Sequence, residues 1–220
     1  MKPVYALGWR AMRMVARWYF RCRVLHPERV PLCGPVILAA NHASYIDPPL
    51  IGAALRRELH YLARASLFRH RFSAALLRAL NCVPVEREGG GAAGLRAILD
   101  RLHAGAGILL FPEGTRTFDG RRQRARAGIG LVVIKSTCPV VPVRVFGSYE
   151  AFGRHVRVPR PWRLAVKFGQ PMHFAAERAE AEHVSKARLK AVYQQVADGL
   201  MGAVAKLQPC AELDRFPASR

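Results

Sequence analysis

Residues 35–57 read PVILAANHASYIDPPLIGAALRR, and this stretch decides the fold. An unbroken apolar run that starts after Pro35 and ends at Ala40 is typical of a buried strand. The polar turn that follows leads to Asp47 and Pro48, and Asp followed by Pro is a common opening of a helix. The stretch therefore predicts a strand over 35–40, a polar turn, and a helix over 48–57.

The same alternation of short apolar runs and helical patterns continues along the chain. Further strands are predicted at 59–63, 82–86, 107–111, 140–146 and 162–168, and further helices at 71–80, 92–104, 127–137 and 175–206. Alternating strands and helices indicate an α/β fold, here a largely parallel sheet flanked by helices. Because such sheets bind ligands beyond the carboxyl ends of their strands, polar motifs at those ends supply the candidate functional residues.

Length and composition set the organisation of the chain. It has 220 residues, of which 51% are apolar, so it suffices for one domain with a sizeable core. We divide it into an N-terminal segment at 1–30, an α/β domain at 31–208 and a polar tail at 209–220. The five cysteines are scattered, with no CxxC pair and no Cys/His cluster at zinc spacing, so we expect no metal site and a reducing compartment.

The N-terminal segment, PVYALGWRAMRMVARWYFRCR at 3–23, has the pattern of an amphipathic helix. Arg10, Arg13, Arg17 and Arg21 fall on one stripe at helical spacing, and apolar and aromatic side chains fill much of the remaining surface. Such a helix is typical of a membrane interface. The alternative is a helix packed on the domain, with its arginines in water. The arginines also interrupt any signal-peptide core, and no stretch reaches the ~18 apolar residues of a spanning helix.

The charge of the chain predicts anionic partners. Lys and Arg number 35 against 15 Asp and Glu, a formal net charge of +20. Such an excess of positive charge attracts acidic lipid, phosphorylated metabolites, acidic carrier proteins and nucleic acid alike. We expect no nucleic acid among the partners, because no recognition motif is present and the arginines are spread along the chain.

The turn after the first predicted strand, NHASYID at 41–47, is the first candidate site. A histidine held by a carboxylate is the basic unit of general-base catalysis, because the carboxylate fixes the tautomer and stabilises the imidazolium. Both residues also have structural explanations. Asp47 can open a helix, and His42 can be a hydrogen-bonded histidine at a strand end.

A second motif, FPEGTR at 111–116, also follows a predicted strand. Arg116 suits a phosphate because its planar fork can bond two oxygens, and Glu113 can accept a hydrogen bond from a hydroxyl. The alternative is a turn in which these two residues pair with each other.

Two further groups of arginines stand beside predicted elements. Arg87 follows the strand at 82–86, and RRQRARAG at 121–128 precedes a helix. Basic residues beside a helix N-terminus are typical of an anion site, since free N–H groups point the same way. Solvated loop charge is the alternative for most of them.

Together these motifs resemble the glycerophospholipid acyltransferase family, and most closely its small bacterial 1-acylglycerol-3-phosphate acyltransferases. The resemblance rests on the HX4D motif of 41–47, Arg87 after a strand, FPEGTR at 111–116 and Val-Pro-Val at 141–143, in that order. Arg126-Ala127-Gly128 is also similar to the family's basic-x-Gly element. The resemblance covers residues 30–170, most of the chain.

The resemblance implies an O-acyltransferase of phospholipid biosynthesis. A fatty acyl group would pass from acyl-CoA or acyl carrier protein to the free hydroxyl of 1-acylglycerol-3-phosphate, giving phosphatidic acid. Lyso-ornithine lipid, lysophosphatidylethanolamine and lysophosphatidylglycerol are alternative acceptors. It implies no metal and no cofactor, and it places the chain on an anionic phospholipid surface at the cytoplasmic face of the inner membrane, as a peripheral or monotopic protein.

The resemblance also implies a role for each candidate residue. His42 would be the base that deprotonates the acceptor, and Asp47 would orient it. Substrate binding falls to Arg87, Arg116 and Arg126 for the phosphate, to Glu113 for the glycerol portion, and to Gly114 and Thr115. Asn41 and Ser44, or the backbone of Gly114, would stabilise the oxyanion or support the site.

Two other enzyme classes have weaker signals. Gly89, Gly91 and Gly94 form a GxGxxG pattern between a strand and a helix, but a lone match of this kind is weak evidence for a dinucleotide site. Ser44 does not lie in a GxSxG elbow, which argues against a serine hydrolase.

Overall fold

Strand β2 (Val36–Ala40) lies at the centre of the sheet in the computed structural model, which describes residues 1–85 and 91–209. Within these residues the strand order is β1-β7-β6-β2-β5-β3-β4. The other strands are β1 (Arg23–Leu25), β3 (Leu59–Arg64), β4 (Cys82–Val85), β5 (Gly107–Leu110), β6 (Val140–Phe146) and β7 (Ala165–Phe168). All neighbouring pairs are parallel except β6 with β7. The predicted α/β fold with a largely parallel sheet is thus confirmed.

The position of β2 follows from its composition. All five of its side chains are buried, because helices cover both faces of the sheet. Val36, Leu38 and Ala40 belong to the core on one face, and Ile37 and Ala39 to the core on the other. This alternation is the two-residue period of a strand.

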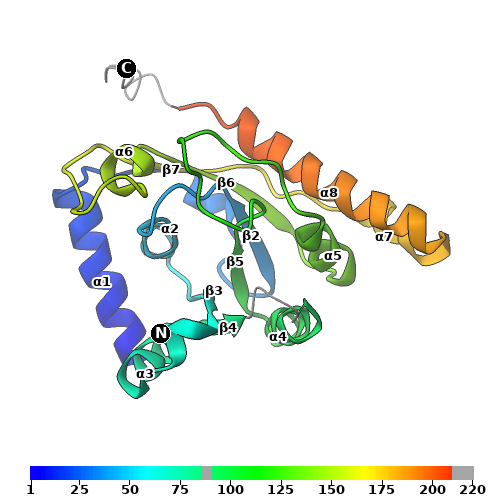
Figure 1. Ribbon diagram of the computed structural model, residues 1–220, viewed down its shortest axis with the longest axis horizontal. Coiled ribbons are helices and arrows are strands. Elements are labelled where there is room, and N and C mark those ends of the chain that lie inside the picture. The colour runs from blue at the N-terminus through cyan, green and yellow to red at the C-terminus, as the bar shows by residue number, and fades with distance from the viewer. Residues whose placement is uncertain (86–90, 210–220) are drawn as a thin grey trace.

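Helices form a layer on each face (Figure 1). One layer contains α1 (Pro3–Trp18), α2 (Asp47–Ala54) and α3 (Arg71–Ala79). The short helices are η1 (Pro27–Arg29), η2 (Ala65–Phe68) and α6 (Ser148–Phe152). The other layer contains α4 (Gly91–His103), α5 (Ala127–Lys135) and α8 (Lys186–Lys206), with α7 (Ala175–His183) leading into α8. Among the helices that the structure describes, none has the length and apolar character needed to cross a bilayer.

The structure corrects several predicted boundaries. The helix expected over 175–206 is two helices, because the chain breaks at Val184 and Ser185 then caps α8 by accepting a hydrogen bond from the backbone N–H of Arg188. The N-terminal helix ends at Trp18 rather than residue 23. Arg21 adopts a φ of 45°, so it lies outside the helix, and the chain turns there into β1.

Gly130 allows α5 and α8 to approach each other closely. A Cβ atom at this position would lie 1.8 Å from the backbone oxygen of Tyr193, which cannot move independently of α8. We expect Gly130→Ala to lower the free energy of unfolding by about 1–3 kcal/mol, as overpacking does. Gly128→Ala is the matched control on the same helix, because its Cβ would meet nothing within 4 Å. Equal denaturation midpoints for the two variants would contradict this packing.

Candidate active site

The turn between β2 and α2 holds His42 and Asp47 together. His42 Nδ1 lies 3.0 Å from Asp47 Oδ2, and the same oxygen accepts the backbone N–H groups of Ala43 and Ser44 at 2.7 Å each. The Asp47 side chain is fully buried at the first position of α2, where the helix dipole favours a negative charge. A carboxylate held in this way fixes the imidazole with its proton on Nδ1, so that Nε2 is available as a base.

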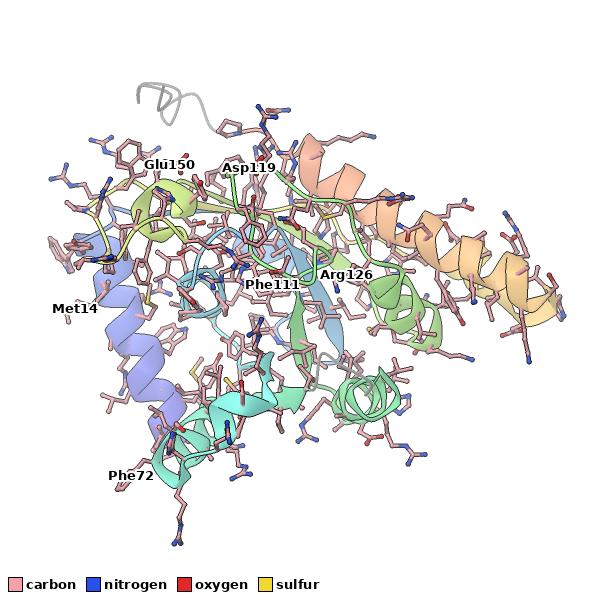
Figure 2. All side chains as sticks on the ribbon, viewed as in Figure 1. Met14, Phe72, Phe111, Asp119, Arg126 and Glu150 are labelled. Atoms are coloured by element: carbon pink, nitrogen blue, oxygen red, sulfur yellow. The ribbon has the colours of Figure 1, made fainter. Side chains whose placement is uncertain are left out.

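Phe111 fixes the plane of the histidine ring. The two rings stack with centroids 3.8 Å apart and an interplanar angle of 17°. Phe111 lies at the end of β5, next to β2 in the sheet, and Figure 2 shows it in the middle of the molecule. The ring of His42 is therefore held on one side by Asp47 and on one face by Phe111, and 16% of its side chain remains exposed.

Glu113 connects the histidine turn to the loop that leads to α5. Its Oε1 accepts the backbone N–H of His42 and its Oε2 accepts the backbone N–H of Gln123, each at 3.0 Å. Burial raises the pKa of the Glu113 carboxyl, and these two hydrogen bonds act in the opposite direction. The family resemblance implied that Glu113 binds the glycerol portion of the acceptor, but in the structure its side chain is 2% exposed and both oxygens accept backbone N–H groups.

Arg116 lies beside the histidine turn without an acidic partner among the described residues. Its guanidinium carbon is 3.3 Å from the centroid of the Tyr45 ring, so Tyr45 is a platform for the cation. Its Nη1 is buried and has no hydrogen-bond partner within the described part of the chain. Arg116 and Glu113 do not form the ion pair that was the structural alternative for this motif.

Arg154 is a second cation beside the turn that carries Arg116, and the sequence analysis did not identify it. Its Nη2 donates to Thr115 Oγ1 at 2.8 Å and to the backbone oxygen of Arg116 at 3.0 Å. Arg154 follows α6, which in turn follows β6, a parallel neighbour of β2. The signal that could have revealed it is this position after a strand end, the same criterion that identified the other motifs.

Three donors that were candidates for stabilising an oxyanion already donate hydrogen bonds to backbone oxygens. The side-chain amide of Asn41 donates to the backbone oxygen of Val145 and accepts from its N–H. Ser44 donates its hydroxyl to the backbone oxygen of Phe152 at 2.6 Å. The N–H of Gly114 donates to the backbone oxygen of Phe111. Asn41 and Ser44 therefore support the turn that carries His42.

Gly114 and Arg126 pack against each other at the start of α5. Gly114 has a φ of +69°, and a Cβ atom there would lie 2.9 Å from the Arg126 side chain. Arg126 is exposed and does not line the cavity that contains His42, although Thr115 and Arg116 do. Arg87 lies outside the described residues, as do the first glycine of the GxGxxG pattern, Gly89, and residues 210–220 of the tail.

A cavity of about 720 Å³ opens beside His42. Its polar lining includes His42, Tyr45, Arg64, Ser66, Thr115, Arg116 and Arg154. The rest of the wall is mainly apolar and comes from α1, α2, β3 and α3, with Trp9, Met12 and Leu80 as examples. A volume of this size suits a small-molecule or lipid-chain site. The sequence did not predict that α1 forms part of this wall.

Two tyrosines within the cavity wall remain uncharged. The hydroxyls of Tyr5 and Tyr61 lie 2.9 Å apart, and Tyr5 also accepts the backbone N–H of Leu59. Burial raises the pKa of Tyr5 and raises that of Tyr61 well above its ordinary value. These two tyrosines therefore add no charge to the cavity wall.

The site has the parts of a general-base enzyme. It combines an imidazole oriented by a buried carboxylate, cationic side chains beside it, and an apolar cavity. Within the described ranges, 1–85 and 91–209, no group of three or more His, Cys, Asp or Glu side chains could hold a metal ion. The arrangement can remove a proton from a hydroxyl that lies next to an anionic group and an apolar chain.

Comparison with known proteins identifies the family. The family model described as Acyltransferase matches residues 21–146, more than half of the chain. The chain therefore belongs to the acyltransferase family. The matched residues include β2, the His42–Asp47 turn, the motif at 111–116 and β6.

Individual relatives are similar over different shares of their length. The 1-acyl-sn-glycerol-3-phosphate acyltransferase of Bacillus subtilis (strain 168) is 23% identical over 191 residues, which cover 86% of this chain and 91% of that protein. The lyso-ornithine lipid O-acyltransferase of Pseudomonas aeruginosa is 28% identical over 134 residues, covering 55% of this chain and 51% of that protein. The crystal structure of the 1-acyl-sn-glycerophosphate (LPA) acyltransferase PlsC from Thermotoga maritima superimposes with a TM-score of 0.65 at 22% identity, covering 91% and 81% of the two chains, and so shares the fold.

Proposed function

We propose that this acyltransferase transfers a fatty acyl group from a thioester to the free hydroxyl of 1-acylglycerol-3-phosphate, giving phosphatidic acid. The observation that carries the proposal is the buried His42–Asp47 pair at a cavity that is apolar on one side and contains Arg116 on the other. The activity named for the Bacillus subtilis relative, which matches over most of both chains, supports the same acceptor.

The reaction couples acyl transfer to two proton transfers, one to His42 and one from it. His42 Nε2 takes the proton of the acceptor hydroxyl, and the oxygen attacks the thioester carbonyl carbon. Asp47 stabilises the imidazolium while it exists. The C–S bond then breaks, the acyl group remains on the acceptor oxygen, and the departing thiolate takes the proton from His42, which regenerates the base. No metal or other cofactor takes part in this scheme, and acyl-CoA and acyl carrier protein both supply the required thioester.

The remaining residues position the substrates. Arg116 lies over Tyr45 and lines the cavity, and its guanidinium makes no hydrogen bond to the described residues, so it is available to the phosphate of the acceptor. Arg87 and Arg126 are further candidates for the phosphate. Glu113 acts through the backbone of His42, because its carboxylate fixes the turn that holds the base.

We also propose that α1 binds the chain to an anionic membrane surface, at the cytoplasmic face of the inner membrane. The helix has two apolar faces. Tyr5, Trp9 and Ala16 face the domain, whereas the opposite face exposes the side chains Val4, Leu7, Met14, Val15 and Trp18. Figure 2 shows Met14 pointing away from the domain. Arginines on the same helix are exposed beside this face, an arrangement that suits anionic headgroups.

Substitution on the outward face of α1 tests the membrane proposal. Leu7 and Trp18 are 69% and 74% exposed, so the variant Leu7→Ser/Trp18→Ser removes apolar contact without changing charge. We expect binding to vesicles of phosphatidylglycerol and phosphatidylethanolamine to fall at least ~10-fold, because each buried apolar side chain contributes roughly 1.5–3 kcal/mol. Leu32→Ser is the matched control, since Leu32 is 74% exposed outside α1. Equal loss in both variants, measured by vesicle sedimentation, would contradict the proposal.

Acceptor-dependent thiol release tests the catalytic proposal. Purified protein in mixed micelles receives a thioester donor and one acceptor: 1-acylglycerol-3-phosphate, lyso-ornithine lipid, lysophosphatidylethanolamine or lysophosphatidylglycerol. We expect the highest kcat/KM with 1-acylglycerol-3-phosphate. The second candidate is acylation of lyso-ornithine lipid, which the named activity of the Pseudomonas aeruginosa relative favours. Release with lyso-ornithine lipid alone would replace the proposed acceptor with that one and leave the mechanism intact.

A further inference from the structure

We propose that Arg154 is a second phosphate-binding cation of the acceptor site, which acts with Arg116 to select a phosphate monoester. The inference rests on the proposed function and specifies how the headgroup is recognised. Arg154 lies outside the motifs that carry the family resemblance, and it lines the same cavity as His42 and Arg116.

The position of Arg154 is fixed by the turn that carries Arg116. Its Nη2 makes both hydrogen bonds to that turn, at 2.8 Å to Thr115 Oγ1 and 3.0 Å to the backbone oxygen of Arg116. Its guanidinium carbon lies 4.1 Å from the centroid of the Phe118 ring. A guanidinium held by two hydrogen bonds and an aromatic face has lost most of its freedom before any ligand arrives, which lowers the entropic cost of binding.

The two arginines retain donors for a ligand. Among the described residues, Arg154 Nε and Nη1 make no hydrogen bond, and the guanidinium of Arg116, which lines the cavity, makes none, although its Nη1 is buried. Neither guanidinium has a carboxylate within salt-bridge distance in the described part of the chain. Both cations line one cavity, so an anion bound in that cavity is attracted by both of them.

The spare donors match the chemistry of a phosphate monoester. Such a group has three unesterified oxygens and up to two negative charges near neutral pH, whereas a diester has two oxygens and one charge. One arginine can bind two oxygens through its fork, and a second arginine can bind the third. Arg116 and Arg154 together therefore favour a phosphate monoester over a diester, because the monoester has more charge and one more free oxygen.

Arg154 could instead act only as a clamp on the 115–116 turn. The two roles predict different kinetics. Loss of a clamp displaces Arg116 and the adjacent turn, which lowers kcat for every acceptor. Loss of a phosphate ligand raises KM for the monoester and leaves diester acceptors less affected.

The test compares Arg154→Gln, Arg154→Lys and the control Arg157→Gln in the full chain. Arg157 is exposed on the same loop and does not line the cavity at His42. With Arg154→Gln we expect KM for 1-acylglycerol-3-phosphate to rise about 10- to 100-fold, the effect of losing a charged hydrogen bond, with kcat changed less than about threefold. KM for lysophosphatidylglycerol should change less, and Arg154→Lys should recover part of the loss.

The pH dependence of KM distinguishes the two roles of Arg154, because loss of a clamp would not change it. The second ionisation of a phosphate monoester has a pKa near 6, so KM of the wild-type chain for 1-acylglycerol-3-phosphate should rise as the pH falls from about 7.5 to 5.5. Arg154→Gln should weaken that dependence. An unchanged KM, or an equal loss of kcat with all acceptors, would overturn the assignment of Arg154. A wild-type chain that acylates only lyso-ornithine lipid would instead show that the proposed acceptor itself is wrong.

Discussion

His42→Ala is expected to reduce acceptor-dependent thiol release by about 10²- to 10⁴-fold, the usual contribution of a positioned general base. Among the described residues that line the cavity, His42 is the only histidine and none is Asp or Glu, and an unactivated alcohol is a poor nucleophile. The effect should fall on kcat, because His42 interacts with the proton in transit and Arg116 still binds the phosphate. The measurement is steady-state thiol release with 1-acylglycerol-3-phosphate.

The matched control is His103→Asn, at the exposed C-terminal end of α4 and outside the cavity. It should keep wild-type activity. Thermal unfolding of both variants checks that the fold is intact, since removing the His42 ring also leaves Phe111 without its stacking partner. Activity within tenfold of wild type in a folded His42→Ala chain would exclude His42 as the base.

Asp47→Asn is expected to lower kcat by about 10²- to 10⁴-fold with a small change in KM. The amide oxygen in the place of Oδ2 can still accept the Nδ1 proton, but the neutral amide cannot stabilise the imidazolium by charge. The Asn oxygen can still accept the N–H groups of Ala43 and Ser44, so the turn should persist. The loss should therefore appear in catalysis more than in the midpoint of thermal unfolding.

Asp100→Asn on the exposed surface of α4 is the control for this substitution, and it should leave kcat unchanged. A comparison with Asp47→Ala separates the two roles of the carboxylate. If Asp47→Asn were as unstable as Asp47→Ala and lost activity only in proportion to unfolded protein, Asp47 would be a structural residue of the turn and not part of the catalytic pair.

The sequence predicted those parts of the site that depend on short spacing. His42 and Asp47 are separated by one turn between a strand and a helix, so their contact follows from local structure. Arg116 was found because it follows β5, and parallel neighbours bring their ends together. The helix boundary at Val184 was missed because the charged and apolar pattern continues across it, and only the tertiary packing shows the break.

Long-range contacts explain what the sequence could not give. Glu113 was expected to face a ligand, because its position after a strand does not show that the N–H groups of His42 and Gln123 converge on it. Arg154 stands 38 residues after Arg116, and no local pattern relates them. Only the topology, with β5 and β6 on either side of β2, brings the two arginines to one cavity.

The double use of α1 has a consequence for engineering this enzyme. The same sixteen residues form part of the cavity wall on one side and an exposed apolar face on the other. The helix is therefore not an interchangeable module. A chimaera that takes this helix from another acyltransferase would replace a wall of the cavity together with the face that we propose binds the membrane. Changes in acyl-chain preference and in lipid affinity would then be inherited together, and separating them requires substitutions confined to one face.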